Sequence, residues 1–509
     1  MTATRFKIVA REYRDSVSLM QLSATLAKLP GVEQASAIMA TENNLALLAE
    51  AGLWVEAFGV SFTDLLIAVS GKEEVLEHAI EHALELLTRQ VDGAGTRAEA
   101  GARPRTLELA LKGTGRAGLA LISTPGEYAA AEALKALRLG LDVMLFSDNV
   151  SEEDELGLKQ LARERDLIVM GPDCGTAIVN GVPLAFANVV RRGRIGVIGA
   201  SGTGLQEVTV LIDRMGLGIS HALGTGGRDL SRKIGGLSML KALRDLADDR
   251  TTEVIVLISK PPAPEIVERV IAAAEKAGKP VVVNFLGATP SAAERGNLRF
   301  ARTLEAAART AVALATGETR PRRPELPVPP ALPQLTAKQR YIRGLYSGGT
   351  FCYEASLLLS ECLTDVYSNT PVSAAAELTD VRHSHHHTLI DLGDDAFTRG
   401  RPHPMIDYRM RNERIVAEAE DPESAVIVLD VVLGYGSHAD PVAELVPAVR
   451  RARALATAAG RNIVFVGHIC GTDRDPQDLA RQSRQLEEAG VILAESNAQA
   501  ALLAAAIVA

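Results

Sequence analysis

One pattern constrains the fold of this chain more than any other. An apolar strand, a glycine-rich turn and a helix follow one another, and this arrangement occurs in two halves. Residues 193–208 read GRIGVIGASGTGLQEV and residues 341–355 read YIRGLYSGGTFCYEA, so each half has a glutamate four residues after a Gly-Thr step. Both halves later carry the tetrapeptide VIVL and then a valine-rich strand that ends at Gly287 or Gly471. Because these landmarks agree in order and strand type, we predict an internal duplication.

The apolar strands alternate with helical segments, which is typical of α/β proteins with parallel sheets covered on both faces. We expect a small N-terminal α/β domain at 1–90, then βαβ segments at 107–190 and 191–316, and a second βαβ half at 338–509. Between the halves, residues 317–337 contain six prolines in 21 residues, which predicts a semi-rigid linker.

Composition narrows the class of protein. Apolar residues make up 47% of the chain and charged residues 23%, as in folded rather than disordered proteins. The net charge of −9 and the aromatic content of 4% argue against a nucleic-acid partner. No apolar stretch reaches the length of a membrane span, and the N-terminus lacks the apolar core of a signal peptide. We therefore expect a cytoplasmic protein without a membrane contact.

The cysteines indicate neither a disulfide framework nor a metal centre. Cys174, Cys352, Cys362 and Cys470 are widely separated and form no CxxC pair, so we expect reduced thiols. The run VRHSHHHT (381–388) resembles a metal site by composition, but no cysteine or carboxylate framework accompanies its histidines. We expect no bound metal.

Three glycine-rich turns follow expected strands, at the sheet edge where parallel α/β proteins bind ligands. Helix N-terminal amides and the helix dipole favour an anion at such turns. Capping by serine or threonine is the alternative explanation for any one of them, and none ends as a P-loop does. The turns are Ser201-Gly202-Thr203-Gly204, Ser347-Gly348-Gly349-Thr350 and Leu433-Gly434-Tyr435-Gly436-Ser437-His438. The residues that we predict to bind phosphate are Ser201, Gly202, Thr203, Gly204, Gly434, Gly436 and Ser437.

Three residues near these turns are candidates for catalysis. Glu207 and Glu354 lie one helical turn after their threonines, where they could orient a catalytic group or position the substrate. The alternative is an ordinary glutamate favoured by the helix dipole. His438 could act as a nucleophile or general base beside the phosphate, although a lone loop histidine usually has no such role.

Other loop residues are candidates for binding the substrate. Arg399, Arg401 and His403 lie in a proline-stiffened loop, and guanidinium groups suit the recognition of a carboxylate or phosphate. A solvated basic loop is the alternative. Asp173 and Cys174 follow a strand end in GPDCGT and could face the substrate, with a buried structural thiol as the alternative for Cys174.

The chain closely resembles the FdrA family over essentially its whole length, in LISTPGEYAAAEALKALRLG, VMGPDCGTAIVNGVPLAFANV, GTGGRDLSRKIGG, LIDLGDD, GRPHPMID and LDVVLGYGSHADP. FdrA proteins are similar to succinyl-CoA synthetase. The resemblance implies a Rossmann-like CoA-binding-type domain at 107–190 and a flavodoxin-like ligase domain at 191–316, both similar to domains of the synthetase's α chain. It implies a second flavodoxin-like ligase domain at 338–509, similar to the C-terminal domain of the synthetase's β chain. The implied CoA contacts are Pro125, Gly126 and Ser147.

Two departures from the synthetase matter. The segment 287–297 matches the loop that carries the synthetase's active-site histidine, but it contains no histidine, and the nearest counterpart lies around Gly296 and Asn297. The ATP-grasp domain is also missing, so we expect no ATP site within this chain. In the synthetase, the helix starts that match 201–204 and 434–437 hold the phosphoryl group between the two ligase domains.

The resemblance implies an enzyme subunit that transfers a carbamoyl group in ureide (allantoin) catabolism, with oxalurate and phosphate giving oxamate and carbamoyl phosphate. Arg399 and Arg401 would hold the oxalurate carboxylate, and other subunits encoded alongside would be partners. One alternative is an acyl-CoA ligase that uses CoA and a separate ATP-grasp partner. Another is a non-catalytic scaffold. Phosphate and carbamoyl phosphate are the expected small-molecule ligands, while CoA binding and a homo-oligomer stay open.

Overall fold

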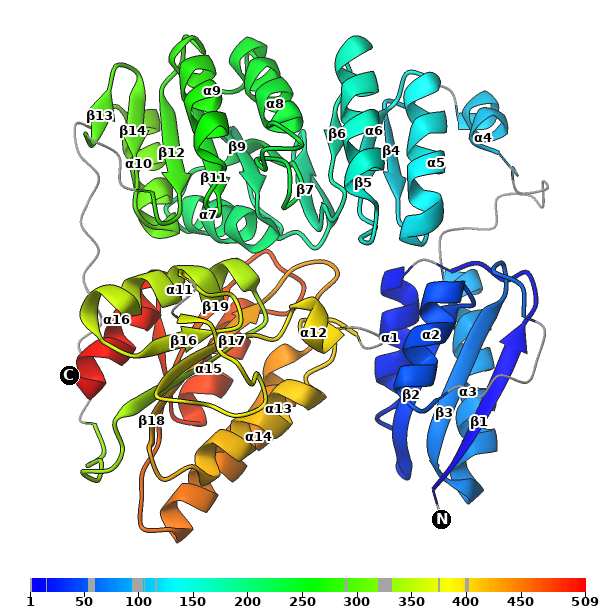
Figure 1. Ribbon diagram of the computed structural model, residues 1–509, viewed down its shortest axis with the longest axis vertical. Coiled ribbons are helices and arrows are strands. Elements are labelled where there is room, and N and C mark those ends of the chain that lie inside the picture. The colour runs from blue at the N-terminus through cyan, green and yellow to red at the C-terminus, as the bar shows by residue number, and fades with distance from the viewer. Residues whose placement is uncertain are drawn as a thin grey trace.

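The computed structural model describes residues 2–14, 16–53, 60–93, 104, 106–114, 117–288, 292–318, 332–373, 376–398 and 402–509. Four α/β units follow one another along the chain and form two rows in space (Figure 1). The N-terminal unit and the second half of the duplication make one row, and the second unit and the first half make the other. The prediction of an α/β class with a small N-terminal domain and parallel sheets is confirmed.

The N-terminal unit is an antiparallel sheet of order β1-β3-β2. Leu65, Ile67 and Val69 of its central strand pack on the helices, and the opposite face of the strand buries Leu66. A central strand buried on both faces explains why it reads as a continuous apolar run. The elements are β1 (Thr2–Val9), α1 (Ser16–Leu26), β2 (Val32–Met39), α2 (Glu42–Glu50), β3 (Leu65–Lys72) and α3 (Glu73–Gly93).

The second unit has a parallel sheet of order β4-β5-β6, followed by a hairpin that joins the next sheet. In the hairpin, Asn180 and Gly181 have φ angles of 52° and 81°, which is the signature of a tight hairpin turn. Ile178 pairs with Ala222 of β10, so the hairpin extends the sheet of the first half. The elements are α4 (Leu107–Thr114), β4 (Leu119–Ile122), α5 (Gly126–Arg138), β5 (Asp142–Leu145), α6 (Glu152–Glu164), β6 (Val169–Met170), β7 (Thr176–Val179) and β8 (Val182–Ala185).

The two halves share one topology. Strand order β14-β12-β11-β9-β10 in the first half matches β20-β19-β18-β15-β17 in the second, which is the flavodoxin-like order and agrees with the predicted duplication. The first half has β9 (Arg192–Ala200), α7 (Gly202–Arg214), β10 (Ile219–Gly224), α8 (Leu237–Asp248), β11 (Val254–Ser259), α9 (Pro264–Glu275), β12 (Val281–Phe285), β13 (Glu294–Arg295), β14 (Leu298–Phe300) and α10 (Leu304–Thr316). The second half has β15 (Tyr341–Tyr346), α11 (Gly349–Cys362), β16 (Val366–Ser368), β17 (His387–Asp391), α12 (Asp395–Thr398), α13 (Arg409–Glu420), β18 (Ser424–Val432), α14 (Pro441–Ala458), β19 (Val464–Cys470), α15 (Leu479–Glu488), β20 (Val491–Ala494) and α16 (Asn497–Val508).

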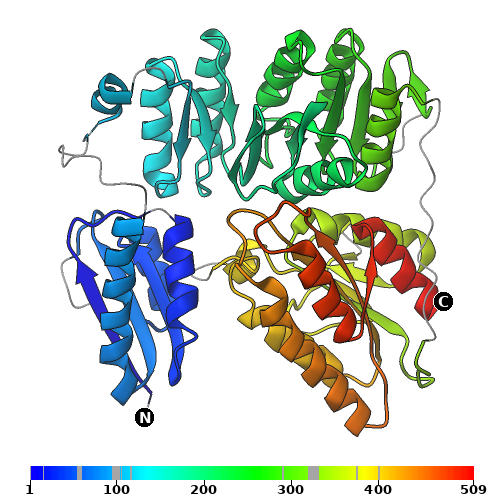
Figure 2. The same cartoon turned by 180° about the vertical axis from the view of Figure 1, so that it is seen from behind.

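Helices α7 and α10 of the first half face α11 and α16 of the second, between the two sheets (Figures 1 and 2). A single apolar core runs through this layer and includes Leu205, Ala308, Phe351 and Leu503. Helix α16 carries the apolar run that ends the sequence. Because it is enclosed in this layer, it needs no polar face.

A buried ion cluster joins the second unit to the first half. Lys159 on α6 is 2% exposed, and its Nζ lies 2.8 Å from both Glu155 Oε1 and Asp229 Oδ1. Asp229, in the loop after β10, also accepts hydrogen bonds from the backbone amides of Ser238 and Met239 at the start of α8. The motif GTGGRDLSR therefore fixes the position of a helix and a domain contact.

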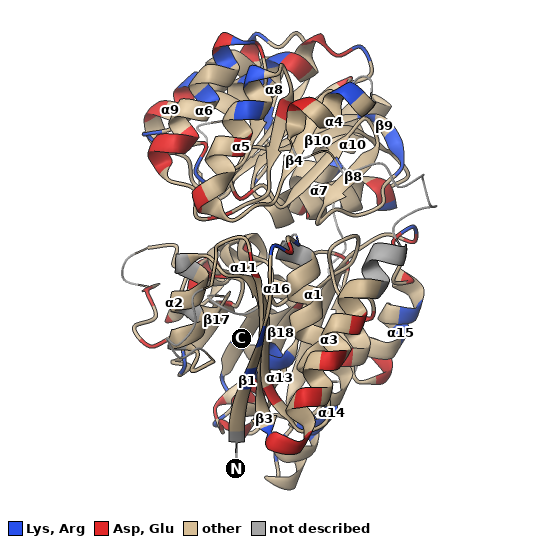
Figure 3. Cartoon of the chain, turned by 90° about the vertical axis from the view of Figure 1, so that its right-hand side faces the viewer, with Lys and Arg blue, Asp and Glu red and all other residues tan. Residues whose placement is uncertain are grey.

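Charged residues lie mainly on the outer helices, such as α3, α6, α8 and α9 (Figure 3). The helical layer between the two sheets is largely apolar. In the part of the chain that the structure describes, no helix combines the length and apolar character needed to cross a bilayer.

The ion cluster predicts a large effect for Lys159→Met. The change leaves Asp229 as a buried carboxylate without its cation, which should lower the unfolding free energy by about 3–5 kcal/mol. The measurement is the urea unfolding midpoint. Lys135→Met is the control, because Lys135 forms an exposed pair with Glu132 and should leave the midpoint unchanged. Equal midpoints for the two variants would contradict the assigned role of Lys159.

Candidate functional site

The N-terminal tips of α7 and α11 meet between the two halves. Ser201 is the N-cap of α7, and its Oγ lies 2.5 Å from Thr350 Oγ1 in the first turn of α11. A Cβ added to Gly348, the N-cap of α11, would lie 3.0 Å from Thr203 Cγ2. The two Gly-Thr steps that revealed the duplication are thus in contact across the domain interface.

At these tips, some backbone amides have an acceptor among the described residues and others have none. Ser201 Oγ accepts the Gly204 amide at 3.0 Å, and the buried Asp430 carboxylate accepts the amides of Ser347 and Gly348 at 2.8 and 2.9 Å. Two helix N-termini with free amides form a strong site for an anion. No described residue accepts a hydrogen bond from the amides of Gly202, Thr203, Gly349, Thr350 or Phe351.

The predicted partner of the Ser201 turn needs correction. Helix α14 begins only at Pro441, so Gly434, Gly436 and Ser437 belong to a loop and not to a helix N-terminus. This loop packs on residues 186–188: the Tyr435 amide donates to the Ala187 carbonyl at 2.9 Å. The turn that meets Ser201 is Ser347–Thr350, because β15 and α11 occupy in the second half the places of β9 and α7.

Glu207 and Glu354 are buried, each with 1% exposure, and they stabilise helices of the opposite half. Glu207 Oε1 accepts the amide of Asn497, the first residue of α16, at 3.1 Å. Glu354 Oε1 accepts the amide of Leu304, the first residue of α10, at 2.7 Å, and its Oε2 accepts Asn497 Nδ2 at 2.8 Å. Both carboxylates therefore position the helices and are occupied by protein donors.

The two glutamates have opposite pKa shifts. Burial raises the pKa of Glu354 to about 7. Burial also acts to raise the pKa of Glu207, but the charge of His468 and the Asn497 amide outweigh it, and the net shift is downward. His468 Nε2 lies 3.6 Å from Glu207 Oε2, and both side chains are buried. Sequence reasoning missed His468; the only signal was a histidine within the valine-rich strand NIVFVGHICG.

Asp391 and His403 lie close to the α11 tip. A Cβ added to Gly349 would lie 2.3 Å from Asp391 Oδ2, and Asp391 Oδ1 accepts the Gly393 amide at 2.9 Å. His403 Nδ1 accepts the Met405 amide at 3.2 Å. Burial lowers the pKa of His403 to about 4, so its ring is neutral and carries its proton on Nε2. That nitrogen faces Gly393, at 2.7 Å from where a Cβ would lie.

Asp173 and Cys174 follow the cis Gly171–Pro172 bond after β6. Asp173 is itself exposed, but partial loss of hydration among the surrounding protein and the charge of Asp148 raise its pKa to about 6. The Cys174 thiol is buried and lies 3.4 Å from the Gly224 carbonyl, and burial raises its pKa to about 12. A buried, protonated thiol is inert, which favours the structural alternative for Cys174.

His438 and Asn297 bond parts of the chain other than the two tips. His438 Nε2 is 3.0 Å from Nζ of Lys28 in the N-terminal unit, and its Nδ1 accepts the Asp440 amide at 3.0 Å, so His438 belongs to a domain contact. Asn297 bonds the Lys279 carbonyl, at the edge of the sheet where β12 begins, away from the strand ends that carry the turns. Arg399 and Arg401 lie outside the described residues.

The predicted CoA contacts surround the start of α5. Pro125 is the N-cap of this helix, and Ser147 Oγ donates to the Thr124 carbonyl at 2.5 Å. A Cβ added to Gly126 would lie 2.2 Å from the Asp148 carbonyl, so the loop after β5 approaches this helix start closely. CoA binding at these residues stays a prediction.

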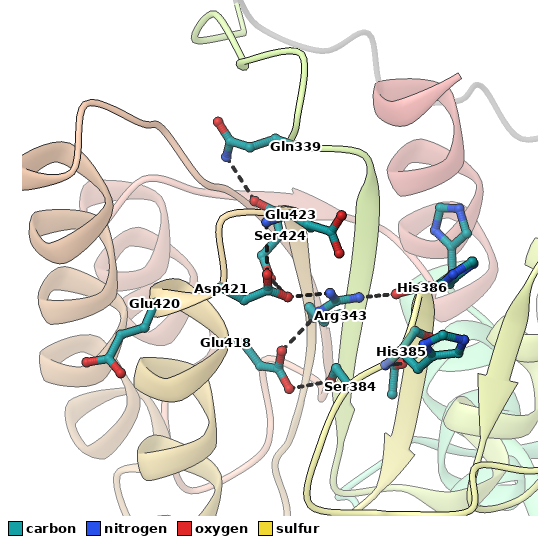
Figure 4. Close-up of polar contacts among 12 residues, drawn as sticks. Gln339, Arg343, Ser384, His385, His386, Glu418, Glu420, Asp421, Glu423 and Ser424 are labelled. Atoms are coloured by element: carbon teal, nitrogen blue, oxygen red, sulfur yellow. Dashed lines mark hydrogen bonds and ion pairs between the residues drawn. The ribbon is translucent and has the colours of Figure 1, made fainter.

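The histidine run lies at the opposite end of the second sheet. His385 and His386 precede β17 (Figure 4). The glycine turns instead follow strand ends. Figure 4 shows the buried Arg343 beside them: its guanidinium donates to the His386 carbonyl, bonds Asp421 Oδ2 at 2.5 Å and lies 3.0 Å from Glu418 Oε2. Among the described residues, no three His, Cys, Asp or Glu side chains are grouped to hold a metal ion.

Family models match three parts of the chain. They match residues 1–104 (AllF, heavy metal-associated domain), 190–287 (CoA binding domain) and 345–507 (CoA-ligase). Residues 1–104 contain no cysteine. The CoA-binding match covers the first half, whereas the resemblance placed a CoA-binding-type domain at 107–190.

Similar proteins cover between about a third and nearly all of the chain. The uncharacterized protein YahF of Escherichia coli is 46% identical over 99% of this chain and 98% of its own length. Subunit alpha of the Aquifex aeolicus succinate–CoA ligase is 28% identical over 37% of this chain and 63% of its own length. A dinucleotide-forming acetyl-coenzyme A synthetase of Ca. Korarchaeum cryptofilum has a TM-score of 0.33 and 14% identity, over 77% of this chain and 82% of its own.

The two buried glutamates predict opposite pH profiles of stability. Folded Glu354 has a raised pKa, so its contribution is complete at acidic pH and is lost as the pH rises from about 4.5 to about 7. Glu354→Gln should remove this decline, which amounts to up to about 3 kcal/mol. Folded Glu207 has a lowered pKa, so its contribution is present above its unfolded pKa and is lost as the pH falls. Glu207→Gln should therefore reduce the unfolding free energy at neutral pH.

Urea unfolding of the parent chain and both variants across this pH range is the measurement. Each variant serves as the control for the other, because both replace a buried glutamate with an isosteric amide. Parallel profiles for the two variants would show that the assigned charge states are wrong.

Proposed function

The chain belongs to the FdrA family of succinyl-CoA synthetase-like proteins, and from this premise we propose that it transfers a carbamoyl group between a nitrogen and phosphate. The substrates are oxalurate and phosphate, and the products are oxamate and carbamoyl phosphate. The chain acts with partner subunits, as the ligase relatives are themselves subunits. Its place would be in ureide catabolism.

The meeting of the α7 and α11 tips is the observation that carries this proposal. Five amides without an acceptor among the described residues lie at the two helix N-termini, where the hydroxyls of Ser201 and Thr350 meet. Such donors suit a phosphate dianion. They also stabilise the oxyanion that develops when phosphate attacks a carbonyl carbon, because they are already oriented before the reaction.

The chemistry needs no covalent enzyme intermediate. An oxygen of monohydrogen phosphate attacks the carbamoyl carbon of oxalurate, and the bond from that carbon to the oxamate nitrogen breaks. The proton of the phosphate passes to the departing nitrogen. Asp391 is placed to carry it, because its carboxylate lies against Gly349 at the α11 tip and burial raises its pKa to about 6. The lack of a histidine in 287–297 fits direct transfer, since positioning alone can supply several kcal/mol.

In this proposal, residues of the loop before α13 bind the oxalurate carboxylate. Arg399 and Arg401 remain our candidates for this role, and the described neighbour His403 contributes a neutral Nε2–H donor beside Gly393. Its ring centroid lies 6.2 Å from that of Phe186, which belongs to the segment after β8. His403 and Phe186 therefore lie together on the proposed acyl side of the site.

A second candidate function is an acyl-CoA ligase that works with a separate ATP-grasp chain. The match of the CoA-binding family model to 190–287 favours it, as does the similarity to ligase α subunits. This alternative requires CoA binding, for which Pro125, Gly126 and Ser147 are the predicted contacts. It also requires a group to replace the missing histidine. His438 is held by the N-terminal unit through Lys28, so it is poorly placed for that role.

Ser201→Asp tests the phosphate site. The carboxylate can still cap α7, but it brings a negative charge to the junction of the two tips and should repel phosphate. Phosphate at a hundredfold excess over its Kd should stabilise the parent by about 2.7 kcal/mol, and this effect should be absent in the variant. With partner subunits added, the variant should also lose phosphorolysis of oxalurate.

Ser151→Asp is the matched control, because Ser151 is the N-cap of α6 and accepts the Asp154 amide in the same way. It should respond to phosphate as the parent does. Equal stabilisation of the parent and Ser201→Asp by phosphate would place the site elsewhere. Stabilisation of the parent by CoA but not by phosphate would favour the ligase alternative.

A further inference from the structure

Lys260 is the first residue after β11, at the carboxyl end of that strand. Strands β11 and β9 pair in parallel, with Ser259 beside Ala200, so Lys260 stands beside Ser201. After these two strands the connections run to opposite faces of the sheet, because β9 leads into α7 and β11 leads into α9. In sheets of this order, ligands bind where neighbouring connections run to opposite faces. Sequence reasoning did not select Lys260, since ISKPPAP reads as a simple turn.

The lysine follows the face of the sheet that α7 and α10 cover, and α11 of the second half packs against α7. Ile258, two residues earlier, contacts α7: a Cβ on Gly204 would lie 3.1 Å from its Cγ2. Residues two apart in a strand share a face. Lys260 Nζ lies 6.0 Å from the ring centroid of Tyr353, in the second turn of α11. The ammonium group therefore extends from the first half toward the tip of the second half.

Lys260 has no carboxylate to neutralise it. Within the described ranges, no Asp or Glu oxygen lies within 4.0 Å of its Nζ, although the residue is half-buried. Other shielded lysines of the same half are paired: Lys241 bonds Asp245, and Lys279 bonds two backbone carbonyls. An unpaired cation in partly dehydrated surroundings is costly unless an anion joins it.

The positive charge of Lys260 acts on two aspartates, Asp391 and Asp173. Its charge acts to lower the pKa of the buried Asp391 and that of Asp173, in each case against the upward effect of lost hydration. Lys260 thus lies within electrostatic reach of Asp391, whose carboxylate borders the α11 tip. The lysine, the aspartate and the free amides all border the same junction of the two halves.

Comparison of the two halves shows that the position of Lys260 is charged in the first half only. When the VIVL segments at 254–257 and 426–429 are aligned, Lys260 corresponds to Val432, which is fully buried in the core. Ile258 corresponds to Asp430, which is used to hold the Ser347 turn. The second half therefore has no lysine at this position, and the cation beside its turn, Arg411, is already paired with Asp430.

We propose that Lys260 binds the phosphate dianion, and the phosphate group of carbamoyl phosphate, at the junction of α7 and α11. The inference rests on the proposed function, because it names a residue of that same oxyanion site. The amides hold the oxygens in place, and the ammonium group neutralises charge that neutral donors cannot. Phosphate then lies on the Lys260 side, and the acyl substrate lies on the side of Asp391 and His403.

Isothermal titration of the full chain with inorganic phosphate at constant ionic strength tests the role of Lys260. Lys260→Met keeps the length and apolar stem of the side chain without its charge. It should raise the Kd for phosphate by about 10- to 100-fold, the loss expected for one hydrogen bond to a charged group. Lys260→Arg should restore most of the affinity. Lys276→Met, at the exposed C-cap of α9 in the same half, is the control and should bind as the parent does.

The outcomes separate this inference from the proposed function. If Lys260→Met binds phosphate as tightly as the parent while Ser201→Asp does not, the oxyanion site stands and the role of Lys260 is wrong. If both variants bind as the parent does, or the parent itself does not bind phosphate, both proposals fail. Unchanged urea midpoints for the Lys260 variants, together with recovery in Lys260→Arg, exclude misfolding as the cause of lost affinity.

Discussion

The rest of the site depends on a buried exchange of hydrogen bonds between the two halves. Glu207 of the first half holds the start of α16, and Glu354 of the second half holds the start of α10. Each glutamate lies one helical turn from the threonine at the tip of its own helix. The bonds that join the halves therefore also set the distance between the two tips. Asn497 links both carboxylates, so neither cap can shift without the other.

Duplication gives the chain two similar helix tips, but the residues around the two tips differ. In the second half, the Asp430 carboxylate uses two amides to anchor its turn, while the corresponding Ile258 packs against α7. Lys260 likewise has no charged counterpart. An exact two-fold site would treat both substrates alike. Under the proposed function, the asymmetric site would distinguish a phosphate side from an acyl side.

Much of the architecture could be predicted from local pattern. Valine-rich strands, the Gly-Thr steps and the VIVL tetrapeptides identified both sheets and their duplication, because strand and turn signals are written in neighbouring residues. The Asn180-Gly181 hairpin could have been found in the same way. The sequence could not predict which turn meets Ser201, because the three glycine turns looked equivalent. Only tertiary packing selects Ser347–Thr350. Burial explains the other differences: Glu207 and Glu354 resembled catalytic groups, but both are enclosed as helix caps.

The most direct test of the central claim is a crystal structure of the chain soaked with tungstate, an electron-dense analogue of phosphate. The account predicts one anion between the helices, within hydrogen-bond distance of amides from both tips, Gly202–Thr203 and Gly349–Phe351, and of Lys260 Nζ. An anion bound at one tip alone, or density only at the start of α5 near Gly126, would contradict a single site shared by the two halves.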